Sequence, residues 1–232
     1  MDDLTDALVA AWHMVAAGDA EIAAITLRTL LVSGAATALA LLLGVPAGYL
    51  LARRQFRGRT FVTTLVHTGM GMPPVLVGLV IWLLVVRSGP LGDLDLAYTR
   101  TAMTVAQVVV ALPVVTAFSC AAFAALPPGL TDLFTMLGAG RVRRLLLLAR
   151  EARLGLLAAV MAAFGAVISE VGAAMTVGGN LAGETRVLTT AIVTETGRGR
   201  HDRALALGLV LLLLVLALNL GLTLLQQRER RT

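Results

Sequence analysis

Five apolar segments, each long enough to cross a bilayer, constrain this chain more than any other feature. They cover residues 22–52, 61–86, 101–125, 154–177 and 204–225. Each reaches the roughly 20 residues that a helix needs to cross the hydrocarbon core at about 1.5 Å per residue. Of all residues, 58% are hydrophobic and 14% are charged, whereas a soluble domain has about 45–50% and about 25%. The sequence therefore predicts an all-α integral membrane protein with about five transmembrane helices.

The expected organisation around these spans has three parts. Residues 1–21 are expected to form an external amphipathic helix, with a frayed terminus as the alternative for the first few residues. The apolar residues that recur there at helical spacing are Leu4, Leu8, Trp12 and Val15. Residues 22–225 are expected to form the transmembrane domain, with a cytoplasmic loop at about 126–153. Residues 226–232 would then be a cytoplasmic tail.

The arginines predict the orientation. All 19 basic residues are arginine, and the net charge is +5. Twelve of them lie in the loops after the first and third spans and in the tail, against seven on the other side. Because cytoplasmic loops are enriched in basic residues, we expect the N-terminus outside and the C-terminus inside, in a bacterial or archaeal cell membrane. The arginines flank apolar runs and are not interleaved with aromatics, so membrane lipid and not nucleic acid is the expected partner.

Residues that could carry catalysis or bind a metal are sparse. The single Cys120 excludes an intramolecular disulfide and a multi-cysteine metal site. His13, His67 and His201 are scattered, with no cluster at metal-ligand spacing. No Gly-rich P-loop is present. We therefore expect no enzyme activity, no catalytic residue, no metal and no cofactor on this chain.

Proline and glycine interrupt three of the spans. Pro46 and Pro113 stand in the first and third spans, and Pro73 and Pro74 follow two glycines in the second. Each proline removes a backbone hydrogen bond. Such breaks persist at membrane depth only where protein or water satisfies the freed groups. For Pro73 and Pro74, a plain kink and an interrupted helix that lines a translocation path are equal alternatives.

Glu170 lies inside the fourth apolar span. A charge at the centre of a membrane helix costs about 2.5–3.5 kcal/mol on insertion scales, so the carboxylate should face the bundle or a wet cavity. It could pair with an arginine, bond groups exposed by broken helices in the second or third span, or line a path. A structural or gating role is favoured, because buried charges are normally paired. Glu170→Gln is expected to fold and insert but to gate abnormally.

The loop between the third and fourth spans contains a short helix. Pro127-Pro128-Gly129 stops the third span, and Thr131 is placed to cap a helix with Asp132 in its first turn. Gly138-Ala139-Gly140 ends this helix. Its apolar face consists of Leu133, Phe134 and Leu137. The helix would suit docking into a groove on a soluble partner, and an elbow between spans is the alternative.

Asp132-Leu133-Phe134 followed by Gly138 resembles the "EAA…G" loop of permease subunits of binding-protein-dependent ABC importers. Leu133 and Phe134 replace the two alanines, and the usual Leu-Pro ending is absent. Further segments resemble the tungstate-type permeases, relatives of the molybdate permeases, over residues 19–200. They include "GMGMPPVLVG", "TAMTVAQVVVALPVV" and, most specifically, "ISEVGAAMTVGGNLAGETRVLTTAIVTETGRG".

This resemblance implies the type I permease fold of ABC importers. It also implies a second copy of the chain in a homodimer, a homodimeric ABC ATPase that uses ATP-Mg, and an extracytoplasmic oxyanion-binding protein. The expected cargo is tungstate, with molybdate and sulfate as alternatives. The short helix would be the coupling helix that fits into the ATPase. Its expected contact residues are Asp132, Leu133, Phe134, Leu137, Gly138, Ala139 and Arg141.

A path for an oxyanion between two protomers needs weak, neutral hydrogen-bond donors. Threonines and a glycine-rich turn after the fourth span supply such donors, and Arg186 is the only cation that we expect nearby. The candidates for the path or its gate are Pro73, Pro74, Glu170, Thr176, Gly178, Gly179, Asn180, Thr185, Arg186, Thr189 and Thr190. A secondary transporter or channel is the alternative of another class, although no internal repeat is visible between the halves.

Overall fold

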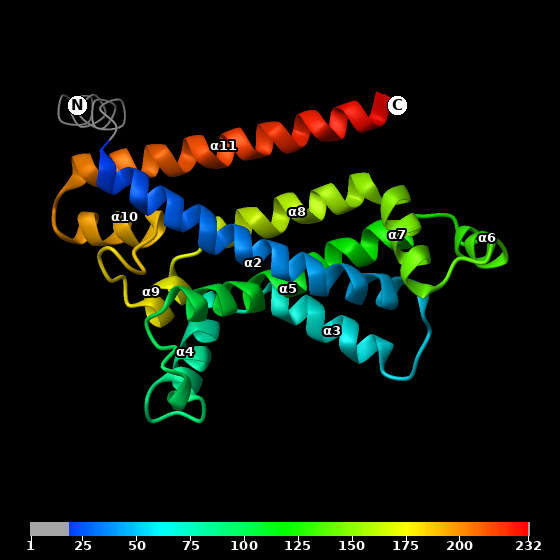
Figure 1. Cartoon of the computed structure of the whole chain (residues 1–232), viewed down its shortest axis with the longest axis horizontal. Coiled ribbons are helices and arrows are strands. Elements are labelled where there is room, and N and C mark those ends of the chain that lie inside the picture. The colour runs from blue at the N-terminus through cyan, green and yellow to red at the C-terminus, as the bar shows by residue number, and fades with distance from the viewer. Residues whose placement is uncertain (1–18, 232) are drawn as a thin grey trace.

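Long helices run along an elongated bundle, and short helices stand at its two ends (Figure 1). The computed structural model describes residues 19–231, so the expected amphipathic helix at residues 1–21 lies almost wholly outside the described residues. The described helices are α2 (Ala20–Arg53), α3 (Arg59–Met70), α4 (Pro74–Val85), α5 (Arg100–Ala124), α6 (Leu130–Met136), α7 (Arg141–Glu151), α8 (Arg153–Ile168), α9 (Gly172–Gly178), α10 (Leu188–Gly197) and α11 (His201–Arg231), with a 3-10 turn at Gly92–Leu94.

Three of these helices are individually long and apolar enough to cross a membrane: α2, α5 and α11. Two bent pairs bring the number to five if each pair is counted as one span. The first pair is α3 and α4, which meet at 101°, and the second is α7 and α8, which meet at 83°. The predicted all-helical membrane fold is thus confirmed, with three to five spans.

The prolines have different effects on the helices. Pro46 and Pro113 lie inside α2 and α5, which remain single helices. Pro73 and Pro74 stand at the start of α4, where a missing N–H costs nothing because the first turn has no partner for it. The second span is an interrupted helix and not one kinked helix, and its expected place on a translocation path stays a prediction. A Cβ atom on Gly69 would lie 2.7 Å from Pro113 Cγ, so this break packs closely against α5.

The fourth span also differs from the prediction of one helix at 154–177. Helix α8 ends at Ile168, three residues follow without α-helical structure, and α9 begins at Gly172. The sequence did not reveal this interruption, because the apolar run continues on both sides of it. Glu170 satisfies the backbone groups that the break exposes, as described below.

Glycines bring α2 and α5 into direct contact. A Cβ on Gly44 would lie 2.7 Å from Val115 Cγ1, and one on Gly48 would lie 2.8 Å from the backbone N of Cys120. Small residues of this kind allow membrane helices to approach backbone to backbone. These two helices form the centre of the bundle, whereas α11 exposes a row of leucines at the rim of the bundle. This row comprises Leu212, Leu216, Leu220 and Leu224.

Candidate functional site

The carboxylate of Glu170 caps helix α9. Glu170 lies in the break between α8 and α9 and is 6% exposed. Its Oε1 accepts the N–H of Ala173 at 2.7 Å, and its Oε2 accepts the N–H of Ala174 at 3.0 Å. A negative charge at this position also suits the positive end of the helix dipole.

Three alternatives were considered for Glu170. The structure shows the one in which its carboxylate bonds to backbone groups exposed by a broken helix. The expectation that this break lies in the second or third span is wrong, because it lies in the fourth span itself. No arginine pairs with Glu170 in the described part of the chain. Its part in gating stays a prediction.

The same break is tied to helices α10 and α2. The Thr189 hydroxyl donates to the carbonyl oxygen of Glu170 at 2.9 Å. The Thr190 hydroxyl accepts the N–H of Val187 at 3.1 Å and so caps the start of α10. The next N–H, that of Leu188, donates to the hydroxyl of Thr29 in α2 at 2.9 Å. Threonine side chains therefore hold the start of α10 against the Glu170 break.

The turn after α9 is folded back on itself. Gly179 has φ +66°, and a Cβ there would also lie 2.6 Å from the Tyr98 ring, so glycine is needed at this position. Asn180 follows with φ +52° and donates to the Thr194 hydroxyl of α10. The Thr185 hydroxyl donates to the carbonyl of Gly178 and accepts the N–H of Leu181.

Arginines from three parts of the chain meet at residues 183–186. Arg28, which is 8% exposed, donates to the carbonyl of Arg186 at 2.9 Å. Arg100 donates to the carbonyl of Glu184 at 2.7 Å. The guanidinium of Arg186 lies 3.8 Å from the carboxylate of Glu21. The expectation that Arg186 is the only nearby cation is therefore wrong. Arg28 lies within the first apolar span, where a charged residue is itself a signal of a functional or structural role.

The path candidates mostly bond to protein groups in this conformation. Thr189 and Thr190 are 5% and 0% exposed, and their hydroxyls donate to backbone carbonyls. The Thr176 hydroxyl donates to the carbonyl of Gly172 in its own helix. Pro73 and Pro74 lie at the α3–α4 break, close to the α4–α9 contact, where a Cβ on Gly78 would lie 2.7 Å from Ala173 Cα. A translocation role for these residues stays a prediction.

The double variant Thr189→Val, Thr190→Val tests that role. We expect uptake of the cargo to fall about thirtyfold, because each lost hydroxyl removes a hydrogen bond of about 1 kcal/mol, or about 2 kcal/mol for the pair. The measurement is cargo uptake by cells that express the variant at wild-type level. The double serine variant, which keeps both hydroxyls, should retain uptake. Unchanged uptake in the double valine variant would show that these threonines do not line the path.

The short helix α6 stands apart at the end of the bundle opposite α9 and α10 (Figure 1). It begins at Leu130 with Gly129 as its N-cap residue, so the expected cap by Thr131 is wrong. Gly129 already has helical angles, which moves the start of the helix ahead of Thr131, but Asp132 does lie in the first turn.

The end of α6 is the one predicted from the sequence. Gly138 has φ +75°, a conformation that favours glycine. Its N–H donates to the carbonyl of Thr135, and the N–H of Ala139 donates to that of Phe134, both at 3.0 Å. This pair of bonds is the Schellman motif.

The apolar face of α6 is divided between the bundle and solvent. Phe134 packs against the buried cluster of Phe123, Leu148 and Ala152 and so anchors the helix. The other expected residues, Leu133 and Leu137, are 49% and 73% exposed. They are joined by Met136, which is 85% exposed and which sequence reasoning missed. Ala139 is half-buried, and Arg141 is exposed at the start of α7.

The structure thus has a short exposed helix in an interhelical loop, on a bundle that contains broken spans. The family described as "Binding-protein-dependent transport system inner membrane component" matches residues 44–231. The chain belongs to this family. It is thus a multi-pass, inner-membrane permease component, as the resemblance of the α6 loop predicted.

Several relatives of this permease are named as transporters of anions. It is 42% identical to a probable anion ABC transporter permease protein of Haloferax volcanii, over 80% of this chain and 84% of the relative. It is 34% identical to the tungstate uptake system permease protein TupB of Peptoclostridium acidaminophilum, over 88% and 90% of the two chains. A solved structure of the MetNI methionine ABC transporter covers 88% of this permease and 92% of that chain, with TM-score 0.64 and 19% identity. This last likeness bears on the fold alone.

Proposed function

We propose that this permease imports a tetrahedral oxyanion, tungstate, with ATP-Mg hydrolysed on a separate ABC ATPase. The observation that carries the proposal is the 34% identity to a tungstate uptake permease over 88% of the chain. An extracytoplasmic oxyanion-binding protein delivers the anion, and two permease copies enclose the path. The N-terminus lies outside and the C-terminus in the cytoplasm, in line with the excess of arginine on the α6 side.

Helix α6 docks into the ATPase in this proposal. Its exposed side chains Leu133, Met136 and Leu137 form the docking surface, while Phe134 transmits force to the bundle. Closure of the ATPase moves α6 together with α5 and α8, which flank it in the chain. The break at Glu170 lies at the far end of α8, where a change of angle between α8 and α9 would open or close the path.

Molybdate is the second candidate cargo. The permease is also 27% identical to the molybdenum transport system permease protein ModB of Escherichia coli, over 72% of this chain and 77% of the relative. Tungstate and molybdate are both tetrahedral dianions, and the sites that separate them lie largely in the binding protein. Sulfate is also a tetrahedral dianion and is the third anion to be tested as cargo.

Metal uptake in cells distinguishes these cargoes. Cells that express the permease with its ATPase and binding protein are given equal tungstate and molybdate, with and without excess sulfate. We expect tungsten to accumulate, molybdenum to accumulate less, and sulfate to have little effect, as measured by elemental mass spectrometry. Preferred accumulation of molybdenum would identify molybdate, and not tungstate, as the cargo. The proposal would be rejected if the accumulation of both metals were independent of the permease.

The variant Leu137→Ser tests the docking surface. Burying a leucine contributes about 1.5–3 kcal/mol, so we expect at least about tenfold less ATPase to co-purify with the variant. Its melting temperature should not change, because Leu137 is 73% exposed. Val142→Ser on α7 is the matched control, since Val142 is equally exposed but lies outside α6. Wild-type recovery of ATPase with Leu137→Ser would contradict docking through α6.

A further inference from the structure

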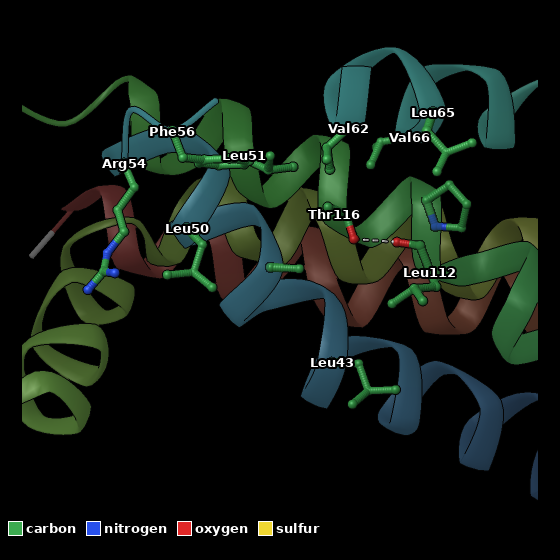
Figure 2. Close-up of a pocket in the computed structure, with 12 residues that line it drawn as sticks. Leu43, Leu50, Leu51, Arg54, Phe56, Val62, Leu65, Val66, Leu112 and Thr116 are labelled. Carbon is green, nitrogen blue, oxygen red and sulfur yellow. Dashed lines mark hydrogen bonds between the residues drawn. The ribbon is translucent and has the colours of Figure 1, made fainter. Parts of the chain in front are cut away.

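An apolar recess lies between α2, α3 and α5, towards the end of the bundle that carries α6 (Figure 2). Its volume is about 810 Å³, which is in the range of about 300–1,000 Å³ typical of small-ligand sites. Leu43 and Leu50 of α2, Val62 and Val66 of α3 and Leu112 of α5 line it. Thr116 also lines it, but its hydroxyl is satisfied by the carbonyl of Leu112 at 2.7 Å. The recess therefore offers almost no polar partner along its length.

Helix α3, which forms one wall of the recess, is weakly held by the rest of the bundle. None of its residues is buried, and Phe61 and Leu65 are 72% and 60% exposed. It packs chiefly on α5. No residue that the structure describes fills the space between α3 and α2. At membrane depth such a space is filled by an acyl chain or by another protein.

One end of the recess is basic. Arg54 lines it and lies with Arg57 in the α2–α3 connection, between Arg53 at the end of α2 and Arg59 at the start of α3. Arg53 and Arg59 donate to the carbonyls of Leu126 and Leu51. The side chains of Arg54 and Arg57, by contrast, form no hydrogen bond or ion pair with the residues that the structure describes, although the backbone N–H of Arg54 donates to the carbonyl of Leu50. No Asp or Glu occurs anywhere between residues 22 and 92 or within α5.

We propose that this recess binds an anionic glycerophospholipid. One acyl chain lies between α2 and α3, and the phosphate group bonds to Arg54, with Arg57 beside it. The charge pattern favours this occupant, because basic pockets between membrane helices attract anionic headgroups. The side chains of Leu43, Leu50 and Leu65 at the recess are exposed, so an acyl chain can enter there from the bilayer in this proposal. The lipid fills the gap beside α3 and holds that helix at its present distance from α2.

The test compares lipid binding by the full-length permease in detergent. Purified protein is titrated with phosphatidylglycerol or phosphatidylcholine, and bound lipid is counted by native mass spectrometry, with thermal stability in parallel. We expect phosphatidylglycerol to bind at least fivefold better and to raise the melting temperature. Arg54→Gln, which removes the free cation, should abolish this preference. Ala47→Phe, which fills the recess from α2 without changing charge, should lower the binding of both lipids.

Two controls make the outcome specific. Arg143→Gln removes an exposed arginine of α7 at the same end of the bundle, and it should leave lipid binding unchanged. If Ala47→Phe impairs folding, Ala47→Leu provides a smaller filling. Equal binding of the two lipids, or an equal loss with Arg143→Gln, would overturn the proposal. The proposal would also be overturned if Ala47→Phe shifted the monomer–dimer equilibrium but left lipid binding intact. That result would mean that a second copy of the chain occupies the recess.

Discussion

Glu170→Ala should give the largest loss of stability of any single change in the broken fourth span. The carboxylate is the acceptor for the N–H groups of Ala173 and Ala174, and both bonds are buried. A buried donor left without a partner costs about 1–3 kcal/mol. The two together should lower the free energy of unfolding by roughly 2–6 kcal/mol. Thermal unfolding in detergent measures the loss, and transport assays should show ATP hydrolysis without uptake.

Glu170→Gln separates charge from shape. Its amide has one acceptor oxygen, and the NH₂ group would face one of the two N–H donors, so it should be less stable than wild type but more stable than the alanine variant. The expected abnormal gating of this variant remains to be measured. Ser169→Ala is the neighbouring control, because that exposed hydroxyl bonds only within α8. If Glu170→Ala has the melting temperature of the wild type and couples ATP hydrolysis to uptake as the wild type does, the cap has no energetic importance.

Gly48→Ala should separate the two central helices. The added methyl would lie 2.7 Å from Ser119 Cβ and 2.8 Å from both the Cys120 nitrogen and the Thr116 carbonyl oxygen. Two of these three atoms are backbone atoms, so the contact is relieved only if α2 moves away from α5. Overpacking of this kind costs typically 1–3 kcal/mol, and more where backbone must shift. We expect a lower melting temperature and poor assembly with the ATPase.

Gly34→Ala is the matched control on the same helix. Nothing lies within 4 Å of a Cβ at Gly34. Because alanine is a better helix former than glycine by up to about 1 kcal/mol, this variant should be as stable as the wild type or slightly more stable. Equal melting temperatures for Gly48→Ala and Gly34→Ala would mean that the α2–α5 contact tolerates separation.

Features set by local composition were predictable from the sequence. The apolar runs gave the helical membrane class, because length and hydropathy alone decide whether a segment can span. Gly138 predicted the end of α6, since the left-handed conformation after a helix is a property of the residues beside it. A disturbance of the helix at Pro73 and Pro74 also followed from the local loss of N–H donors, although a kink and an interrupted helix were equal alternatives.

Features that depend on distant residues were not predictable. Arg28 finds its acceptor at Arg186, which is 158 positions away in the chain. The cap on α9 was missed because apolar residues surround Glu170 on both sides and resemble one continuous helix. The division of α6, with Phe134 inward and Met136 outward, depends on the place of Phe123 and Leu148 in the bundle. A helical period alone cannot show which part of an apolar face is covered.

The exposure of α6 also makes this chain well suited to spectroscopy. Cys120 is the only cysteine in the sequence, so a Cys120→Ser background has no thiol. A cysteine introduced by Met136→Cys, at a side chain that is 85% exposed, would then carry one fluorophore or spin label per chain. The mobility of that label would follow the engagement of α6 in real time, and in a two-chain assembly the distance between two labels would follow the opening and closing of the pair.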